Sequence, residues 1–173
     1  MKRYPGVVTG IVKSLDDPEG QGRIQLQFPW LSDSQLSSWA PVAATLAGKD
    51  RGQFYMPEID DEVLVAFEHG DFDHPFVLGF LWNGVHVPPT TDPHRRLIRS
   101  LNGHEIEIYD PAISAGDKGY IRLKDAHGNT IELANGRISI TSEPFKGDQR
   151  CSITRSKVSL IMPAKPAIVR GKA

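Results

Sequence analysis

The sequence predicts an all-β protein, and three observations support this prediction. No long segment places apolar residues at positions i, i+3, i+4 and i+7, the spacing of an amphipathic helix; the best candidate, residues 34–45, is interrupted by Pro41. Short apolar runs bounded by Gly, Pro, Asn and Asp recur along the chain instead. These runs are dense in apolar residues up to about Gly84 and become short and strictly alternating after about Ile98. The change of pattern indicates two β-structured parts.

A proline-rich segment separates the two parts. The stretch VHVPPTTDPHRR holds three prolines and two adjacent threonines, a composition typical of an extended linker. We therefore predict a first domain over residues 1–84, a linker over residues 85–97 and a second domain over residues 98–173.

The first domain is predicted to be a small closed barrel. In residues 23–28, the apolar side chains of Ile24, Leu26 and Phe28 alternate with polar ones, which is the pattern of a half-buried strand. Turn sequences such as Asp-Pro-Glu-Gly at residues 17–20 separate the strands. Closure into a barrel would remove the exposed edges of such short antiparallel strands. The five predicted strands lie near residues 6–14, 23–28, 39–43 together with 53–56, 62–68, and 75–82.

Some apolar residues of the first domain have no evident place inside a barrel. Residues 63–67 and 76–78 are apolar on both faces, so their outer face must lie against another subunit or a partner. The strand that ends PEGQGRIQLQFPWL places Phe28, Trp30 and Leu31 together. We expect this apolar corner to contact a hub protein or a neighbouring subunit. The alternative is that residues 32–38 fold back over it.

The second domain is predicted to need more than one chain. Each strand offers about two large apolar side chains flanked by polar ones, and Asn135-Gly136 is a strong signal for a type I′ hairpin turn. So few apolar side chains cannot offset the ordering of some seventy residues in one chain, whereas several chains could share one core. The residues predicted to form this shared core are Ile106, Ile108, Ile121, Leu123, Ile131, Leu133, Ile138 and Ile140, with a weaker pair at Val158 and Leu160.

The composition argues against several chemical functions. The 173 residues carry a net charge of −1, which disfavours general nucleic-acid or membrane-surface binding. The single cysteine, Cys151, indicates synthesis in a reducing compartment. The cluster His69-Gly-Asp-Phe-Asp-His74 reads as a hairpin turn rather than a metal site, and neither a nucleophile elbow nor a phosphate-binding loop is present. We expect no enzyme activity, catalytic residue, metal or cofactor.

As an ordered set, the motifs resemble a known family. PEGQGRIQLQFPWL, WAPVA and GQFYMPEIDDEVLVAFEHGDFDHPFVLGFLWNG resemble the baseplate protein V and VgrG spike family of contractile injection machines. GHEIEIYD and GYIRLKDAHGNTIELANGRISITS resemble the β-helical needle of the same family. The resemblance implies an N-terminal oligonucleotide/oligosaccharide-binding (OB) barrel followed by a trimeric, intertwined β-helix needle. It also implies a place at the centre of the baseplate.

The function implied by the resemblance is a structural central spike. Such a spike is made in the cytoplasm, is built into a phage tail, a tailocin or an extracellular injection particle, and pierces the target envelope when the sheath contracts. Its expected partners are two further copies of the chain, a baseplate hub, a small tip protein of the PAAR type and, transiently, the envelope. Because the barrel begins almost at Met1, we expect the hub to be a separate polypeptide.

Two further expectations concern the end of the chain and the alternatives. Val158, Leu160 and Met162 precede Pro163 and are expected to dock the tip protein, unless residues 164–173 form the point themselves.

The alternative functions are an OB-fold nucleic-acid binder, which would need basic grooves and stacking aromatics, and a carbohydrate-binding or carbohydrate-active β-helix. The latter would need carboxylates converging on a cleft, whereas the acidic residues of the second domain alternate with core residues and are expected to face solvent.

Overall fold

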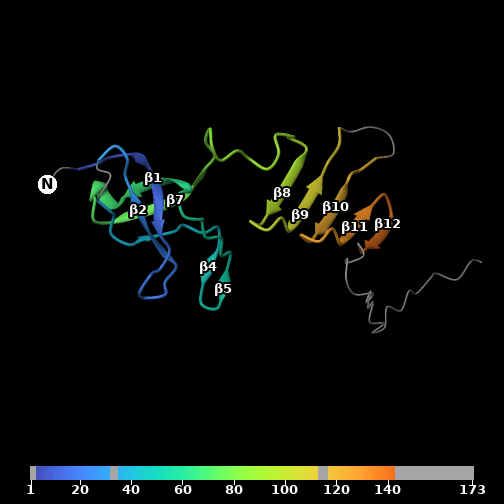
Figure 1. The fold of residues 1–173 in the computed structure, drawn as a ribbon, viewed down its shortest axis with the longest axis horizontal. Coiled ribbons are helices and arrows are strands. Elements are labelled where there is room, and N and C mark those ends of the chain that lie inside the picture. Colours follow the sequence, from blue (N-terminus) through green and yellow to red (C-terminus); the bar gives the residue numbers. More distant parts are fainter. Residues whose placement is uncertain (1–2, 32–34, 113–116, 143–173) are drawn as a thin grey trace, which may run out of the picture. The chain divides into compact units, whose positions relative to one another are not determined.

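The computed structural model describes residues 3–31, 35–112 and 117–142 (Figure 1). The chain divides into two compact units, Met1–Pro89 and Thr90–Ala173, so the boundary falls within the predicted linker. Both units are built from strands, and the described residues hold one short 3-10 turn, η1 (Glu68–Gly70). The prediction of an all-β chain is confirmed for these residues.

The first unit contains a sheet that curves almost into a closed barrel. The strand order is β3-β2-β1-β6-β7, with every neighbouring pair antiparallel. A parallel bridge between Val42 and Val77, together with the hydrogen bond from Ala43 N to Val77 O, joins the two ends of the sheet. The strands are β1 (Val7–Ser14), β2 (Arg23–Gln27), β3 (Ala40–Pro41), β6 (Glu62–Phe67) and β7 (Pro75–Leu81).

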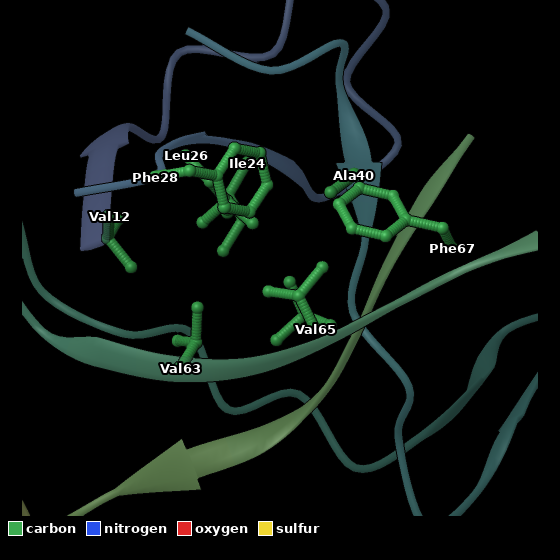
Figure 2. Packing of buried hydrophobic residues seen from close by; sticks show 9 residues of the cluster. Val12, Ile24, Leu26, Phe28, Ala40, Val63, Val65 and Phe67 are labelled. Atoms are coloured by element: carbon green, nitrogen blue, oxygen red, sulfur yellow. The ribbon is translucent and has the colours of Figure 1, made fainter. Parts of the chain in front are cut away.

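The barrel core follows directly from the alternation of the strands. On β2, Ile24 and Leu26 are fully buried, while the polar residues between them are half-buried. On β6, Val63 and Val65 are likewise buried, and Figure 2 shows them across the core from the side chains of β2. The nine buried apolar residues are Val12, Ile24, Leu26, Phe28, Ala40, Val63, Val65, Phe67 and Val77.

A glycine on β1 makes room for the largest side chain of this core. A Cβ atom at Gly10 would lie 3.3 Å from the ring of Phe28 and 3.4 Å from Val65. Both distances are at or below the lower end of ordinary van der Waals contact. The absence of a side chain at Gly10 therefore leaves room for the Phe28 ring beside β1.

One of the five predicted barrel strands differs from the structure. Four strands are confirmed, but the strand predicted from residues 39–43 and 53–56 is only two residues long, at β3. Residues 53–56 are not in a strand; the chain forms a separate hairpin from β4 (Ala47–Gly48) and β5 (Arg51–Gly52). This hairpin contains Asp50 and Gly52, with φ angles of 55° and 156°. These backbone conformations turn the chain back on itself, so residues 53–56 do not continue strand β3.

The turn between β1 and β2 is organised by one carboxylate. The side chain of Asp17 is 3% exposed and accepts hydrogen bonds from the backbone N–H groups of Glu19, Gln21 and Arg23. It also accepts from the Arg23 guanidinium, with an Nη2–Oδ1 distance of 2.7 Å. The Arg23 hydrogen bond is the main cause that holds the pKa of Asp17 far below its ordinary value; the backbone donors act in the same direction, and burial of the side chain acts in the opposite one.

The second unit is an antiparallel meander of five strands. Each strand pairs with the next, in the order β12-β11-β10-β9-β8 (Figure 1). The turn at Asn135-Gly136 has φ angles of 47° and 77°, so the predicted type I′ hairpin is confirmed. The strands are β8 (Arg95–Arg99), β9 (Glu105–Tyr109), β10 (Tyr120–Lys124), β11 (Thr130–Ala134) and β12 (Arg137–Thr141).

One boundary of this meander differs from the sequence expectation. Strand β8 begins at Arg95, so the last residues of the predicted linker are in a strand. The five strands take their backbone partners from the same chain. The described residues of the second unit therefore form a self-paired sheet, and the intertwined β-helix lies beyond what they show.

The Asp17 turn gives a prediction for stability against pH. Because the pKa of Asp17 is lower in the folded chain than in the unfolded chain, its ionised form stabilises the first unit at neutral pH. This contribution should be lost progressively as the pH falls below about 4, the ordinary pKa of an aspartate. Asp17→Asn should therefore lower the free energy of unfolding at pH 7, and the difference from wild type should shrink in acid.

Urea unfolding followed by tryptophan fluorescence measures this effect, because Trp30, Trp39 and Trp82 all lie in the first unit. Asp16→Asn is the matched control, because the side chain of the neighbouring Asp16 takes no part in the hydrogen bonds of the Asp17 turn. A difference between Asp17→Asn and wild type that stays constant from pH 7 to pH 3 would contradict the assigned role of the carboxylate.

Candidate functional site

The main candidate site is one face of the second sheet, which we call the apolar face. Strand register aligns its side chains in two rows that cross all five strands. One row is Ile98, Ile106, Leu123, Ile131 and Ile140; the other is Arg96, Ile108, Ile121, Leu133 and Ile138.

All nine apolar side chains of this face are exposed in the single chain. Their exposed fractions run from 41% at Ile108 to 72% at Ile140. The structure thus brings together the eight residues predicted to form a shared core and adds Ile98. Sequence reasoning missed Ile98 because it assigned the preceding residues to the linker, although Arg96 and Ile98 already follow the alternation.

The opposite face of the same sheet carries an ion-pair network. The Arg95 Nε donates to Glu107, and the guanidinium of Arg122 lies 3.5 Å from Glu107 Oε2 and 2.6 Å from Glu132 Oε2. The hydroxyl of Tyr120 also donates to Glu107 at 3.2 Å. Positive and negative charges therefore alternate across β8, β9, β10 and β11.

The exposure of Glu107 corrects one sequence expectation. Alternation correctly places it on the face opposite the apolar residues, but it is 1% exposed rather than facing solvent. The long side chains of Arg95 and Arg122 and the ring of Tyr120 surround it, and the Arg122 guanidinium lies 4.2 Å from the centre of that ring. The hydrogen bond to Glu107 is the main cause of the raised pKa of Arg95, and burial is the main cause of the raised pKa of Tyr120.

The apolar corner of the barrel is only partly open. Phe28 is 1% exposed and belongs to the core, whereas Trp30 and Leu31 are 43% and 38% exposed. The ring of Tyr4 lies 5.3 Å from that of Trp30, so the N-terminal segment covers part of the corner. Of the three residues predicted to make a hub or subunit contact, Trp30 and Leu31 are at the surface. Residues 32–34 of the loop lie outside the described residues.

The outer face of the barrel has a second exposed apolar area. Val7 on β1, Ala66 on β6 and Phe76 on β7 are aligned across the three strands. Val7 is 56% exposed and Phe76 is 39% exposed, and nearby Leu78 is 46% exposed. The two strands predicted to be apolar on both faces thus do leave an apolar outer surface in the single chain.

An open groove of about 430 Å³ lies beside the β4–β5 hairpin and was not anticipated from the sequence. Its walls include Leu46, Arg51, Phe54 and Tyr55, and the Phe54 side chain is 79% exposed. The residues that line the groove include neither Asp nor Glu. The groove therefore lacks the pair of carboxylates that glycoside hydrolysis requires.

Other predicted features can be placed only in part. His69 and His74 flank the turn between β6 and β7, and the part of the chain that the structure describes contains no group of three or more His, Cys, Asp or Glu side chains placed to hold a metal. Within the same residues, no helix is long and apolar enough to cross a membrane. The predicted tip-docking residues Val158, Leu160 and Met162, and Cys151, lie outside the described residues.

Comparison with known proteins identifies the class of the first unit. Residues 8–82 match the family described as the type VI secretion system/phage-baseplate injector OB domain. The barrel is therefore an OB domain of this family, and the resemblance inferred from the sequence is confirmed.

The chain is similar to several proteins, which include spike proteins of the type VI secretion system. It is 33% identical over 88 residues to the type VI secretion system spike protein VgrG2a of Pseudomonas aeruginosa, covering 49% of this chain and 10% of that protein. It is 32% identical over 131 residues to the spike protein VgrG4b of the same organism, covering 70% of this chain and 15% of that protein. The chain is 31% identical over 103 residues to the actin cross-linking toxin VgrG1 of Vibrio cholerae serotype O1, covering 53% of this chain and 9% of that protein. The chain spans about a tenth of the length of the first of these relatives.

The ion-pair network of the second sheet gives a second prediction. Glu107→Gln would leave Arg95 and Arg122 without their shared carboxylate and should lower the local stability of the sheet by about 1–3 kcal/mol, the usual cost of removing one partner of a buried hydrogen bond. Hydrogen exchange measured by mass spectrometry should show faster exchange in β9 and β10. Glu105→Gln is the control, because its ion pairs are longer, at 3.4 and 4.0 Å. Equal effects of the two substitutions would mean that Glu107 has no special role.

Proposed function

We propose that this chain is a structural, non-enzymatic central spike of a contractile injection machine and that it works as a homotrimer. The observation that supports this proposal is the apolar face of the second sheet. Nine large apolar side chains in two continuous rows form a far larger exposed apolar surface than scattered single residues do. Such a surface is stable in water only when it is covered.

Two further copies of the chain are the proposed cover. Strands β9 to β12 would each present two apolar side chains toward the common axis, so three copies would contribute six at each of these levels of the shared core, and Ile98 of β8 would contribute one per copy. The opposite faces, with their Arg–Glu pairs, stay in contact with water. The number three comes from the similarity to spike proteins, and the regular rows supply a surface that three copies can share along its whole length.

The proposed mechanism is mechanical. Sheath contraction would drive the spike forward, and a narrow, stiff needle would concentrate the force on a small area of the target envelope. Stiffness would come from backbone pairing along the whole sheet together with a close-packed apolar centre. The chain would be part of the baseplate of a phage tail, a tailocin or an extracellular injection particle.

The remaining partners follow from the same proposal. A separate baseplate hub is proposed to contact the barrel at Trp30 and Leu31, which remain exposed beside Tyr4. A small tip protein of the PAAR type is proposed to dock at Val158, Leu160 and Met162. Contact with the target envelope would be transient.

Nucleic-acid binding, the main alternative for an OB domain, has less support. The first unit carries 6 Lys and Arg against 12 Asp and Glu, so it would repel a phosphate backbone. The absence of binding to single-stranded DNA at low salt would agree with the spike; tight binding that weakens steeply with salt would favour the alternative.

The proposed trimer is tested first by the mass of the purified chain. Light scattering should give three times the mass of one 19.1 kDa chain. Ile131→Asp should abolish this assembly, because it would bring three carboxylates into the shared core, where burying a charge is very costly. The barrel should remain folded, as reported by its tryptophan fluorescence.

Ile131→Leu is the matched control and should keep the trimer, since it changes shape but neither volume nor polarity. A wild-type chain that stays monomeric at micromolar concentration would overturn the proposal. A trimer that survives Ile131→Asp would show that the apolar face is not the contact.

The proposed hub contact is tested separately. Trp30→Ala should weaken co-purification with the hub and leave the trimer mass unchanged, because the side chain is 43% exposed and its removal leaves the barrel core in place. Phe54→Ala, which removes an exposed aromatic ring elsewhere on the barrel, is the control. Hub binding that is insensitive to Trp30→Ala would place the contact on another surface.

A further inference from the structure

The chain leaves the barrel through a turn that one asparagine closes. Asn83 lies two residues after the end of β7, and its backbone N–H donates to the backbone oxygen of His86 at 2.9 Å. Its side-chain oxygen accepts from the backbone N–H groups of Val85 and His86, at 2.8 and 2.7 Å. Asn side chains stabilise turns through such bonds to nearby backbone groups. Residues 83–86, which include the first two residues of the predicted linker, therefore form a hydrogen-bonded turn.

The nitrogen of the same side-chain amide reaches a neighbouring strand. Asn83 Nδ2 donates to Glu62 Oε2 at 2.9 Å. Glu62 is the first residue of β6, and it is aligned with Leu81, the last residue of β7. The side chain of Asn83 thus extends the contact between β6 and β7 beyond the end of their backbone pairing.

A second contact joins the same two segments. His86 Nδ1 lies 3.4 Å from Asp61 Oδ1, one residue before Glu62. Asp61 is itself fixed to β1, because its backbone oxygen accepts from the N–H of Val12. We call the contacts of Asn83 and His86 with Glu62 and Asp61 the Asn83 clasp.

The clasp attaches the chain to an inner strand of the barrel sheet. β6 pairs with β1 on one side and with β7 on the other. β7 is joined to the residues after β3 at Val77, toward its beginning. The end of β7 at Leu81 lies four residues further on, where strand ends ordinarily open first. The clasp therefore acts at the place where β7 would otherwise separate from β6.

The two functional groups of the Asn83 amide have separate parts in the clasp. The oxygen accepts two backbone N–H groups, and the nitrogen donates to a carboxylate, a combination that an amide can provide. An aspartate at this position could still accept from Val85 and His86. It would have no donor for Glu62, and it would place a second negative charge beside that carboxylate.

We propose that the Asn83 clasp anchors the connection between the two units, by making residues 83–86 part of the barrel and by keeping the end of β7 closed against β6. On the other side of the connection, Asp92 donates its N–H to Thr90 Oγ1, and its side chain accepts from the N–H of His94. Residues 90–94 are therefore held by a hydrogen-bonded turn of the second unit.

The residues between these two turns are Val87, Pro88 and Pro89, and their backbone has little freedom. Proline fixes its own φ angle near −65°, and a residue before proline avoids the helical region. The flexible part of the predicted linker is thereby reduced to this short restricted segment. The inference does not depend on the proposed trimer. In a spike driven by contraction, such a connection would pass force between the units rather than bend under it.

Hydrogen exchange of the full-length chain, measured by mass spectrometry, tests the clasp. Asn83→Asp keeps the acceptor of the turn but removes the donor to Glu62 and adds a like charge beside it. Exchange at the end of β7 and the beginning of β6 should become roughly tenfold faster or more, because a hydrogen bond to a charged group contributes about that factor to a local opening.

A second substitution should reverse this effect. In the double variant Asn83→Asp with Glu62→Gln, the donor and the acceptor exchange places, since the new amide at position 62 can donate to the new carboxylate. Exchange should return close to that of the wild type. Asn102→Asp is the matched control: it makes the same chemical change in another Asn-Gly sequence, between β8 and β9, and should leave exchange in the first unit unchanged.

Chymotrypsin cleavage after Trp82 gives an independent measurement. The Trp82 side chain is 70% exposed, but a protease needs an extended segment, which the clasped turn does not offer. Cleavage there should be slow in the wild type, faster in Asn83→Asp and slow again in the double variant. The double variant keeps the aspartate next to the cleaved bond, so its recovery reports the clasp and not the preference of the protease.

The outcomes decide the inference separately from the proposed function. Wild-type exchange and cleavage in Asn83→Asp would show that the clasp does not hold the connection. Failure of Glu62→Gln to reverse the effect would show that the bond between Asn83 and Glu62 is not the contact responsible. An equal effect of Asn102→Asp on the first unit would also overturn the inference. Both measurements can be made on a monomer or a trimer, so a monomeric chain overturns the proposed function and leaves this inference to be decided by its own results.

Discussion

The constraint on which most of this structure depends is the separation of side chains to the two faces of the second sheet. Successive residues of a strand point to opposite faces, and the five strands keep one register, so nine of their ten Ile and Leu side chains gather on one face, and Leu97 alone is aligned with Glu107 on the other. Arg95, Glu107, Arg122 and Glu132 lie on the other face, where they pair, while Arg96 is the one charged member of the two rows on the apolar face. A shift of one residue in any strand would put charges among the apolar side chains and break the ion-pair network at the same time.

The two units deal with apolar surface in different ways. The barrel curves its sheet almost to closure and buries nine apolar residues within one chain. The second sheet stays open and flat enough to leave its apolar residues exposed. The first unit therefore has an apolar core of its own, whereas the described residues of the second unit leave nine apolar side chains exposed to water.

Alternation allowed much of this to be predicted from the sequence. Four strands of the barrel, the Asn135-Gly136 hairpin and the position of eight apolar residues on one face of the second sheet followed from period-two patterns and turn chemistry. The β4–β5 hairpin was missed because two-residue strands carry almost no periodicity. The burial of Glu107 was missed because it depends on which long side chains surround it. The contact between Tyr4 and Trp30 was missed because Tyr4 precedes the first strand and belongs to no alternating pattern.

Gly10 has a consequence for how this barrel can change over time. The missing methyl group at this position is filled by the Phe28 ring, so the two residues occupy one shared volume. A side chain at position 10 becomes acceptable only when position 28 becomes smaller, and a smaller residue at position 28 leaves a void unless position 10 grows. Substitutions at the two sites are therefore expected to be coupled, and barrels of this type that differ at one position should differ at the other.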